Sequence, residues 1–590
     1  MIINQESKKI FKLLNFTFIF YFSSILILTS LGILILPFNE FYKISISNKN
    51  LVLISMIIII LLQLVSKFIE YTLFNKNPIE RRKIIILFFT FLTLVFLTLF
   101  LNTINIRNYE ELILAFLIPI SIVSISGILT YTNIAKVFYT YPPILFLLSA
   151  TFLIATATIL LHLPISSATG EPIALIDSLF IATSAVSCTG LSTVSIGKEL
   201  SIVGQIILMA TIQIGGLLII VVSTAGIFFG LMSRNTIIKL RMASLFETKN
   251  IIEAQKLIVK FIIIAFSSQI IVAILIFPYF YNIEKNTLKA LFYSIFHVIS
   301  GLNNAGFSQY DDSLKKFINS PNFLILISFL ILLGNTSIIT VTELFDYIKT
   351  KIKNFINLLL NRKNFEKFSF SVFSKIIIIT HITLITFGTI CLLILESDNI
   401  LKSSNYPLIN AIFNSISFRT AGFTTIDFTK ARDFTYIFFS ILMFIGGGSI
   451  SVAGGIKMNT IAIIILALVA FLKSYPGLYF KNKEIDIYNL IKANTVVISS
   501  IILLLSFSLI LDEIIKEERF SKTIFELTSA FGTVGTSCGI TNKNLPVQAK
   551  LTLITLMFLG KIGLITLLSS FAVKTPKYIG KLPKEKFPVG

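Results

Sequence analysis

The stretch "TIFELTSAFGTVGTS" (residues 523–537) is a short, half-apolar run that ends in small polar residues and glycine. Three other stretches share this pattern: "SLFIATSAVSCTGLST" (178–193), "SIFHVISGLNNAGFSQ" (294–309) and "AIFNSISFRTAGFTT" (411–425). Each has a phenylalanine, a serine four positions later, and a glycine five or six residues beyond the serine, at Gly190, Gly306, Gly422 and Gly535. The glycines are 116, 116 and 113 residues apart, and this spacing indicates a fourfold internal repeat.

The composition of the 590-residue chain is typical of a membrane protein. Charged residues make up 13%, against roughly 25% in soluble domains, and the mean hydropathy is +0.89. A helix needs about 20 mostly apolar residues to cross a bilayer core, and the sequence supplies such runs repeatedly. We therefore predict an all-α polytopic membrane protein.

The net charge of +21 comes from basic segments between the apolar runs. Basic loops stay on the cytoplasmic side, so residues 232–256, residues 347–375 and the C-terminal tail are predicted to be cytoplasmic, as is the N-terminus. Segments 308–320 and 396–402 mix charge signs and are predicted to lie outside. Cytoplasmic loops thus explain the positive net charge without nucleic acid as a partner. The predicted orientation also means that each short run enters the membrane from the outer face and returns to it.

The repeats divide the chain into consecutive segments. Four apolar runs, near residues 13–37, 51–75, 84–104 and 111–131, form a predicted N-terminal region of extra transmembrane helices over 1–135. Four predicted units follow, each a long helix, a re-entrant short run and a second long helix, over 143–232, 254–350, 370–473 and 487–574, with a cytoplasmic tail over 575–590. Exposed backbone at membrane depth is tolerated only where protein or water surrounds it, so four such loops around one axis predict a central pore.

The four loops offer backbone oxygens and few charges. Carbonyl groups can replace the water shell of a monovalent cation, and glycine allows the backbone conformations that this requires. Helix C-termini add partial negative charge, whereas the rings of Asp or Glu that suit a divalent cation do not appear at the glycines. The predicted filter residues are Cys188, Thr189, Gly190, Leu191, Asn304, Ala305, Gly306, Phe307, Thr420, Ala421, Gly422, Phe423, Thr533, Val534, Gly535 and Thr536.

The second long run of each unit also contains small residues: "QIGGLL" (213–218), "LLGNTS" (332–337), "FIGGGS" (444–449) and "FLGKIG" (558–563). We interpret the first two as sites where helices pack closely. In the third, "GGGSISVAGGIK" (446–457) has five glycines in ten residues, each disfavouring helix by about 1 kcal/mol relative to alanine, and predicts a flexible intramembrane gate.

Two lysines interrupt these runs. A lysine at mid-membrane costs about 2.5–3.5 kcal/mol on insertion scales and is a candidate functional residue, so Lys561 is predicted to meter cation passage below the filter. The alternative is that each lysine side chain extends to the membrane interface, and this alternative carries more weight for Lys457 than for Lys561. The predicted gate residues are Gly446, Gly447, Gly448, Ser449, Ser451, Gly454, Gly455, Lys457 and Lys561. Arg419 precedes the third filter stretch, and we expect it to point away from the pore, toward an acid behind the loop.

Other functions are weighed against a pore. Gly535, Ser537 and Gly539 match the G-x-S-x-G signature of a hydrolase, which would need a base and an orienting acid. We interpret the three histidines, His162, His297 and His381, as packed or interface residues, and we predict a transporter and not an enzyme. A secondary transporter with inverted repeats is disfavoured because these repeats number four and share one orientation. A purely structural subunit leaves the loops unexplained.

The set "SAVSCTGL", "NNAGF", "RTAGF", "FGTVGTSCGIT" and "GGGSISVAGGIK" closely resembles the Trk/Ktr/HKT superfamily of potassium transporters, in particular bacterial TrkH/KtrB-like membrane subunits. The resemblance runs from residue 143 to the C-terminus, and it implies a pseudo-fourfold pore of M1-P-M2 units with one pore per protomer. It implies potassium uptake across the lipid of a bacterial cytoplasmic (inner) membrane, with potassium as bound substrate and no covalent cofactor. Its implied partners are a second copy in a homodimer and a cytoplasmic nucleotide-binding regulatory subunit of the TrkA/KtrA type.

Filter glycines in all four units favour potassium within this family, and a sodium-permeable or sodium-coupled transporter of the same fold is the alternative. The sequence departs from the family pattern at two places. Members usually have arginine where Lys561 stands, so the charge is kept but the fork of donors is lost. The usual gate sequence "GGSxGSTAGGIK" is altered at Ile450 and Val452. The four N-terminal helices exceed the usual extra pair.

Overall fold

The computed structural model describes residues 142–218, 251–360, 365–481, 483–516 and 518–563. The chain divides into two compact parts, residues 1–135 and 136–590, and every described residue belongs to the second part. The predicted N-terminal helices, most of the basic segment 232–256 and the C-terminal tail lie outside the described residues.

Helices dominate the described chain, and we call each set of a long helix, a short helix and a following helix a quarter, numbered in chain order. The long helices are α7 (Pro142–His162), α13 (Ile251–Glu284), α17 (Val372–Glu396) and α21 (Ile487–Ile514). The short helices are α8 (Leu175–Ser187), α14 (Thr287–Leu302), α18 (Pro407–Ser417) and α22 (Phe520–Phe531). The following helices are α10 (Ile202–Gly216), α15 (Pro321–Asn335), α19 (Asp433–Phe444) and α23 (Val547–Ile562).

Local sequence signals account for several helix ends. Pro407 occupies the first position of α18, where a missing N–H breaks no helical hydrogen bond. The side chain of Asn286 caps α14 by accepting the backbone N–H of Lys289. Helix α8 ends before Cys188. The φ of Cys188 is 55°, in the left-handed region that a continuing helix cannot use. Sequence signals thus account for the starts of α14 and α18, and the backbone turn at Cys188 ends α8.

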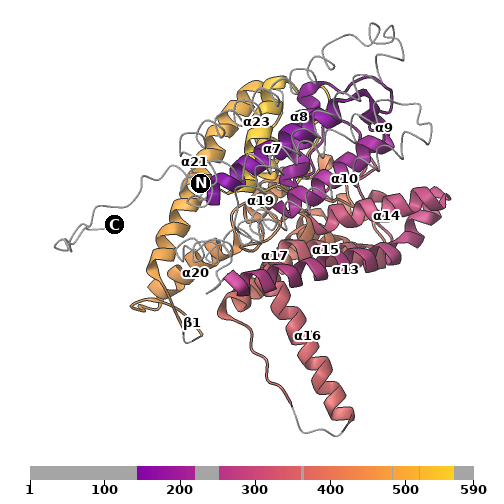
Figure 1. The fold of residues 1–590 in the computed structure, drawn as a ribbon. Helices are drawn as coiled ribbons and strands as arrows, with labels where there is room; N and C mark the ends of the chain where they lie inside the picture. The colour runs from indigo at the N-terminus through magenta and orange to yellow at the C-terminus, as the bar shows by residue number, and fades with distance from the viewer. Residues whose placement is uncertain (1–141, 219–250, 361–364, 482, 517, 564–590) are drawn as a thin grey trace, which may run out of the picture. The chain divides into compact units, whose positions relative to one another are not determined.

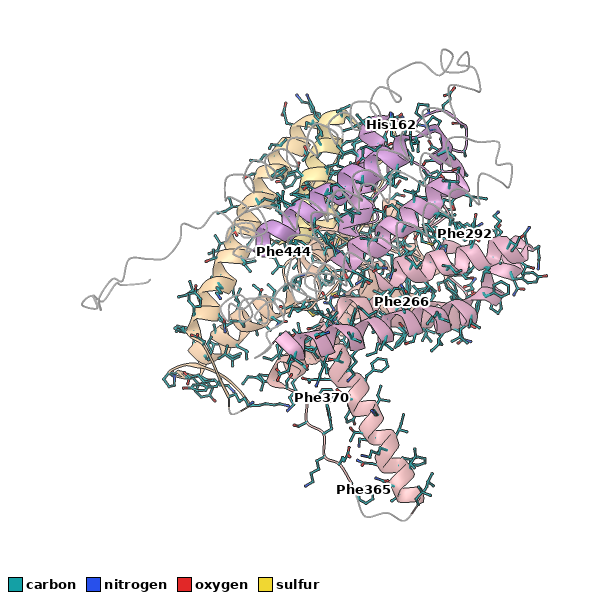
Figure 2. The ribbon with its side chains drawn as sticks, viewed as in Figure 1. His162, Phe266, Phe292, Phe365, Phe370 and Phe444 are labelled. Atoms are coloured by element: carbon teal, nitrogen blue, oxygen red, sulfur yellow. The ribbon has the colours of Figure 1, made fainter. Side chains whose placement is uncertain are left out.

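Three helices of the described chain, α13, α17 and α21, are long and apolar enough to cross a membrane. Along α13, Ile263, Ile270 and Ile274 are 63%, 62% and 68% exposed, and their spacing of seven and four residues places them on one face. Phe266 is exposed on the same helix (Figure 2). A continuous apolar surface of this kind matches a lipid environment.

The last helices of quarters two and three are interrupted. α15 ends at Asn335 and α16 (Ile338–Leu359) begins three residues later, while α19 and α20 (Met458–Leu472) are separated by residues 445–457. The interpretation of "LLGNTS" as a packing site alone is therefore incomplete. A Cβ on Gly334 would lie 1.8 Å from the Leu302 carbonyl oxygen, so the contact is close, but the helix also breaks there. After α20 comes a short hairpin of β1 (Leu478–Phe480) and β2 (Lys483–Ile485).

The following helix of each quarter packs against the short helix of the next quarter. α10 contacts α14, α15 contacts α18, α19 contacts α22, and α23 contacts α8. Figure 1 shows α23, in the yellow part of the chain, beside the indigo α8. Because the fourth quarter returns to the first, the four quarters form a closed cycle.

Candidate functional site

Four glycines, one from each quarter, meet through backbone contacts in a closed ring. A Cβ added to any of them would meet a carbonyl oxygen of the next quarter: Ala305 at 2.3 Å from Gly190, Ala421 at 2.4 Å from Gly306, Val534 at 2.0 Å from Gly422 and Thr189 at 1.9 Å from Gly535. Each oxygen belongs to the residue just before the glycine of its own quarter. Tertiary packing thus brings together four predicted filter positions that are far apart in the sequence.

The repeated serine of each short helix holds the backbone of the loop that follows. The residue before each glycine donates its N–H to the carbonyl of that serine at 2.8 Å: Thr189 to Ser184, Ala305 to Ser300, Ala421 to Ser417 and Val534 to Ser529. The hydroxyls of Ser184 and Ser529 also accept the N–H groups of Gly190 and Gly535, at 3.0 and 3.1 Å. In a trans peptide the C=O opposes the N–H, so these bonds turn the carbonyls of Thr189 and Val534 away from the parent helix.

The ring oxygens have no partner within the described chain. No described residue donates a hydrogen bond to the carbonyl oxygen of Thr189, Ala305, Ala421 or Val534. Buried carbonyl groups are normally paired, so four unpaired oxygens in one ring of contacts form a candidate site for a cation that has shed water. The four short helices end at this ring, and the partial negative charge of their C-termini favours the same occupant.

The side chains of the predicted filter residues support the ring from behind. Leu191, Phe307 and Phe423 are buried in apolar clusters. The Thr536 hydroxyl lies 3.5 Å from the Gly422 carbonyl oxygen and so bridges quarters four and three. The side chains of Cys188, Asn304, Thr420 and Thr533 are buried as well. The unpaired oxygens of the ring are therefore backbone groups, and the side chains named here are buried in the protein.

The glycine-rich segment 446–457 lies against this ring. Gly454 donates its N–H to the Thr533 hydroxyl at 3.0 Å. Gly448 donates to the Asn335 carbonyl at 2.9 Å, so the break after α15 supplies an acceptor for the segment. Asn335 did not emerge from the sequence as a candidate, although "GNTS" at the end of an apolar run is a helix-terminating signal that pointed to it.

Lys561 reaches the same segment from quarter four. Its ammonium group donates to the Val452 carbonyl at 2.7 Å, and the residue is 6% exposed. This contact places the Lys561 side chain inside the protein, which argues against snorkelling. Lys457 instead folds back onto the Ala453 carbonyl at 2.5 Å, within its own segment. The two lysines therefore hold neighbouring carbonyls of one loop.

Arg419 connects the third filter stretch to the start of segment 446–457. It is 1% exposed, and its guanidinium donates to the Gly446 carbonyl at 3.0 Å and to Nδ1 of His381 at 2.8 Å. Arginine has no acceptor, so His381 accepts at Nδ1 and carries its proton on Nε2, which lies 3.3 Å from the Thr336 hydroxyl. The expectation of an acid behind the loop is wrong: these partners are neutral, and within the described chain Arg419 forms no ion pair.

Arg419→Met should lower the thermal midpoint of the detergent-purified protein. The change leaves the Gly446 carbonyl and His381 without their donor, and each buried unpaired group costs about 1–3 kcal/mol. Arg432→Met is the matched control, because Arg432 is exposed at the start of α19. Equal midpoints for the two variants would show that the Arg419 bridge does not stabilise the fold.

Ion pairs join every neighbouring pair of quarters. They are Lys198–Asp311 at 2.5 Å, Lys315–Asp427 at 3.4 Å, Arg519–Asp433 at 3.0 Å and Lys543–Glu199 at 2.8 Å. These pairs are partly exposed, so solvent screens them and they contribute little to stability. A further pair, Lys550–Asp177 at 2.8 Å, is buried and joins α23 to α8. This pair links the fourth quarter to the first, two quarters that are not consecutive in the chain.

Ser537 is not paired with a histidine base within the described chain. Its hydroxyl accepts the N–H of Gly539 at 3.0 Å. Among the described residues, the three histidines form hydrogen bonds with groups other than Ser537. The Ser-His-Asp mechanism needs a histidine hydrogen-bonded to the serine, so the ring of carbonyls is the better candidate site.

The sequence matches the protein family described as "TrkH: Cation transport protein" over residues 149–579. It is 33% identical over 444 residues to Ktr system potassium uptake protein B of Bacillus subtilis, covering 73% of this chain and 93% of that protein. It is 30% identical over 444 residues to the potassium/sodium uptake protein NtpJ of Enterococcus hirae, with the same coverage. The fold is similar to that of the potassium transporter TrkH from Vibrio parahaemolyticus, with a TM-score of 0.53, 19% identity, and coverage of 72% of this chain and 83% of that one.

Proposed function

The chain belongs to the TrkH family of cation transport proteins and is a helical, multi-pass membrane protein, and from this premise we propose that it takes up potassium through the ring of four glycine loops. The closed cycle of glycine–carbonyl contacts is the observation that supports the proposal most strongly. Uptake of potassium by the Bacillus subtilis relative, as its name states, supports the choice of ion.

The proposed filter consists of backbone oxygens around the axis of four M1-P-M2 repeats. The carbonyls of Thr189, Ala305, Ala421 and Val534 replace water around a monovalent ion as it passes. Neutral carbonyls suit a monovalent ion better than a divalent one, for which carboxylate ligands are preferred. The serine-held N–H groups keep the oxygens in place without a side chain entering the path.

The proposed gate is segment 446–457 together with Lys561. Backbone hydrogen bonds attach the segment to quarter two at Asn335 and to quarter four at Gly560, and Lys561 holds the carbonyl of Val452. Opening would require these bonds to be exchanged, which its glycines permit with little steric cost. A buried ammonium group next to the path raises the energy of a passing cation.

Sodium permeation is the second candidate function. The observation that favours it is the name of the Enterococcus hirae relative, a potassium/sodium uptake protein that is 30% identical to this chain. Uptake of rubidium, as a potassium substitute, and of sodium into the same cells separates the two candidates. A large excess of rubidium over sodium supports a potassium filter, whereas comparable uptake supports the alternative.

The proposed setting is the cytoplasmic membrane of a bacterium, as a homodimer with a cytoplasmic nucleotide-binding regulatory subunit. The word "system" in the name of the Bacillus subtilis relative supports a partner of this kind. Co-expression of the chain with such a subunit from its own genome, followed by co-purification in detergent, tests the association.

Wild-type protein should restore growth of a potassium-uptake-deficient bacterium at low external potassium when co-expressed with its regulatory partner. The reason is that a carbonyl filter passes potassium down its electrochemical gradient. Growth rate and rubidium influx are the measurements, and membrane abundance of the protein is the control. Normal abundance without rescue would contradict the proposed function.

A further inference from the structure

The position directly after the repeated phenylalanine of each short helix carries an unassigned pattern. These positions hold Ile181, His297, Asn414 and Glu526. All four residues are completely buried. Three are polar and one is apolar, so the position is not simply part of an apolar core. Buried polar groups require partners, and the partners identify the role.

In quarter three, Asn414 reaches the loop segment that leaves the ring. Its side-chain amide donates to the Thr425 hydroxyl at 2.8 Å, and its oxygen faces the Thr425 backbone N–H at 3.4 Å. Thr425 is the third residue after Gly422. A single side chain therefore connects the short helix to the outgoing arm of the same loop.

In quarter four, Glu526 makes the corresponding connection with a carboxylate. One carboxylate oxygen accepts the backbone N–H of Cys538 at 3.0 Å, and the other accepts the Thr541 hydroxyl. Cys538 is the third residue after Gly535, as Thr425 is after Gly422. The position and the target are the same, although the side chain differs.

In quarter two, His297 takes this role. Its Nδ1 donates to the Tyr293 carbonyl at 2.8 Å, so Nε2 of the neutral ring faces the Ser308 hydroxyl at 3.0 Å. Ser308 is the second residue after Gly306. The imidazole also stacks on Phe423 of the third filter stretch, with ring centroids 6.2 Å apart. This tether therefore touches two neighbouring quarters.

Quarter one lacks the connection. Ile181 packs in an apolar cluster, and it offers no hydrogen-bonding group. Thr193, the third residue after Gly190, is buried, and its hydroxyl has no hydrogen-bond partner within the described chain. The hydroxyl that Asn414 holds in quarter three thus has a counterpart in quarter one, and no side chain of the described chain holds it there.

We propose that His297, Asn414 and Glu526 are positioning residues that fix the outgoing arms of three filter loops, and that the first loop is left without this tether. The inference rests on the proposed potassium filter. Carbonyl oxygens select between ions of different size only while their spacing is held, so the tethers act on selectivity. They do not touch the ion, because their partners lie two to six residues beyond the ring glycines.

The test compares two pairs of matched variants. Asn414→Leu removes a tether, whereas Asn410→Leu makes the same change one turn earlier on α18, where the equally buried amide donates to Ile318, Ser404 and Tyr406 and not to the filter loop. Glu526→Gln weakens a tether. Glu396→Gln instead alters an equally buried carboxylate that accepts the backbone N–H of Arg432, the Thr435 hydroxyl and the Asn399 amide. Thr425→Val removes the hydroxyl that Asn414 binds while nearly keeping the shape of the side chain. This variant replaces Asn414→Leu in the test if Asn414→Leu does not fold.

The readout is the ratio of sodium to rubidium uptake, with thermal midpoints measured in parallel. We expect the tether variants to raise this ratio about tenfold, because one hydrogen bond to a buried group is worth about that factor, and the controls to leave it unchanged. Selective wild-type uptake with equal ratios in tether and control variants would overturn this inference alone. No rubidium uptake by well-expressed wild-type protein would overturn the proposed function and the inference with it.

Discussion

Gly535→Ser should reduce rubidium uptake by at least about 100-fold, because sub-ångström placement of the coordinating groups is lost. A Cβ at this position would lie 1.9 Å from the Thr189 carbonyl oxygen, which is far shorter than a van der Waals contact. The φ of Gly535 is +90°, a value that residues with a side chain rarely adopt, so the backbone must shift as well. Either the ring opens or the Thr189 oxygen turns away, and in both cases one quarter of the proposed filter is lost.

Gly539→Ser is the matched control for this change. Gly539 has a similar φ of +103°, but the nearest atom to its added Cβ is Thr429 Cγ2 at 3.5 Å, an ordinary contact. Both variants carry the backbone strain of about 1–3 kcal/mol, and only Gly535→Ser crowds the ring. Loss of uptake in both variants to the same degree would mean that strain in the loop, and not the ring, causes the defect.

Lys561→Met should increase rubidium uptake roughly tenfold, since a unit charge near the path changes the energy of a cation by about 1–2 kcal/mol at an effective dielectric constant of 20. Methionine keeps the length and apolar stem of the side chain. The change also removes the bond from Lys561 to the Val452 carbonyl, so one attachment of segment 446–457 is released. Both consequences act in the same direction, toward an open path.

Lys561→Arg retains the charge and should keep uptake near the wild-type level. Lys457→Met tests whether position matters. Among the described residues the Lys457 ammonium bonds to Ala453 of its own segment, so this change should have a smaller effect. Influx of rubidium per unit of membrane protein is the measurement. Unchanged or reduced influx in Lys561→Met, at normal abundance, would contradict a metering role for this lysine.

Several features of the site were accessible from the sequence because they repeat. A phenylalanine, a serine and a glycine at constant spacing recur four times, and the structure explains the serine by its carbonyl bond to the residue before each glycine. Small residues within the second long runs of the first two units predicted close helix approach, as at Gly334. Periodicity and glycine placement report local backbone demands, which is why these patterns are readable without coordinates.

The partners of single buried polar groups were not accessible in the same way. Arg419 was expected to face an acid, but it bonds to a backbone carbonyl of segment 446–457 and to neutral His381. Backbone acceptors leave no trace in the sequence, because every residue has one. Asn335 was overlooked for the same reason, since its carbonyl and not its side chain holds Gly448.

The sequence by itself determined that the chain is a helical membrane protein with four related loops, because hydropathy and repeat spacing are properties of the order of residues. The tertiary structure decided which atoms face one another. It showed that each ring glycine meets a carbonyl of the next quarter, that the fourth quarter closes on the first through α23 and α8, and that segment 446–457 reaches Thr533. Contacts between residues 79 or more positions apart arise only when packing brings them together, so no local pattern could specify them.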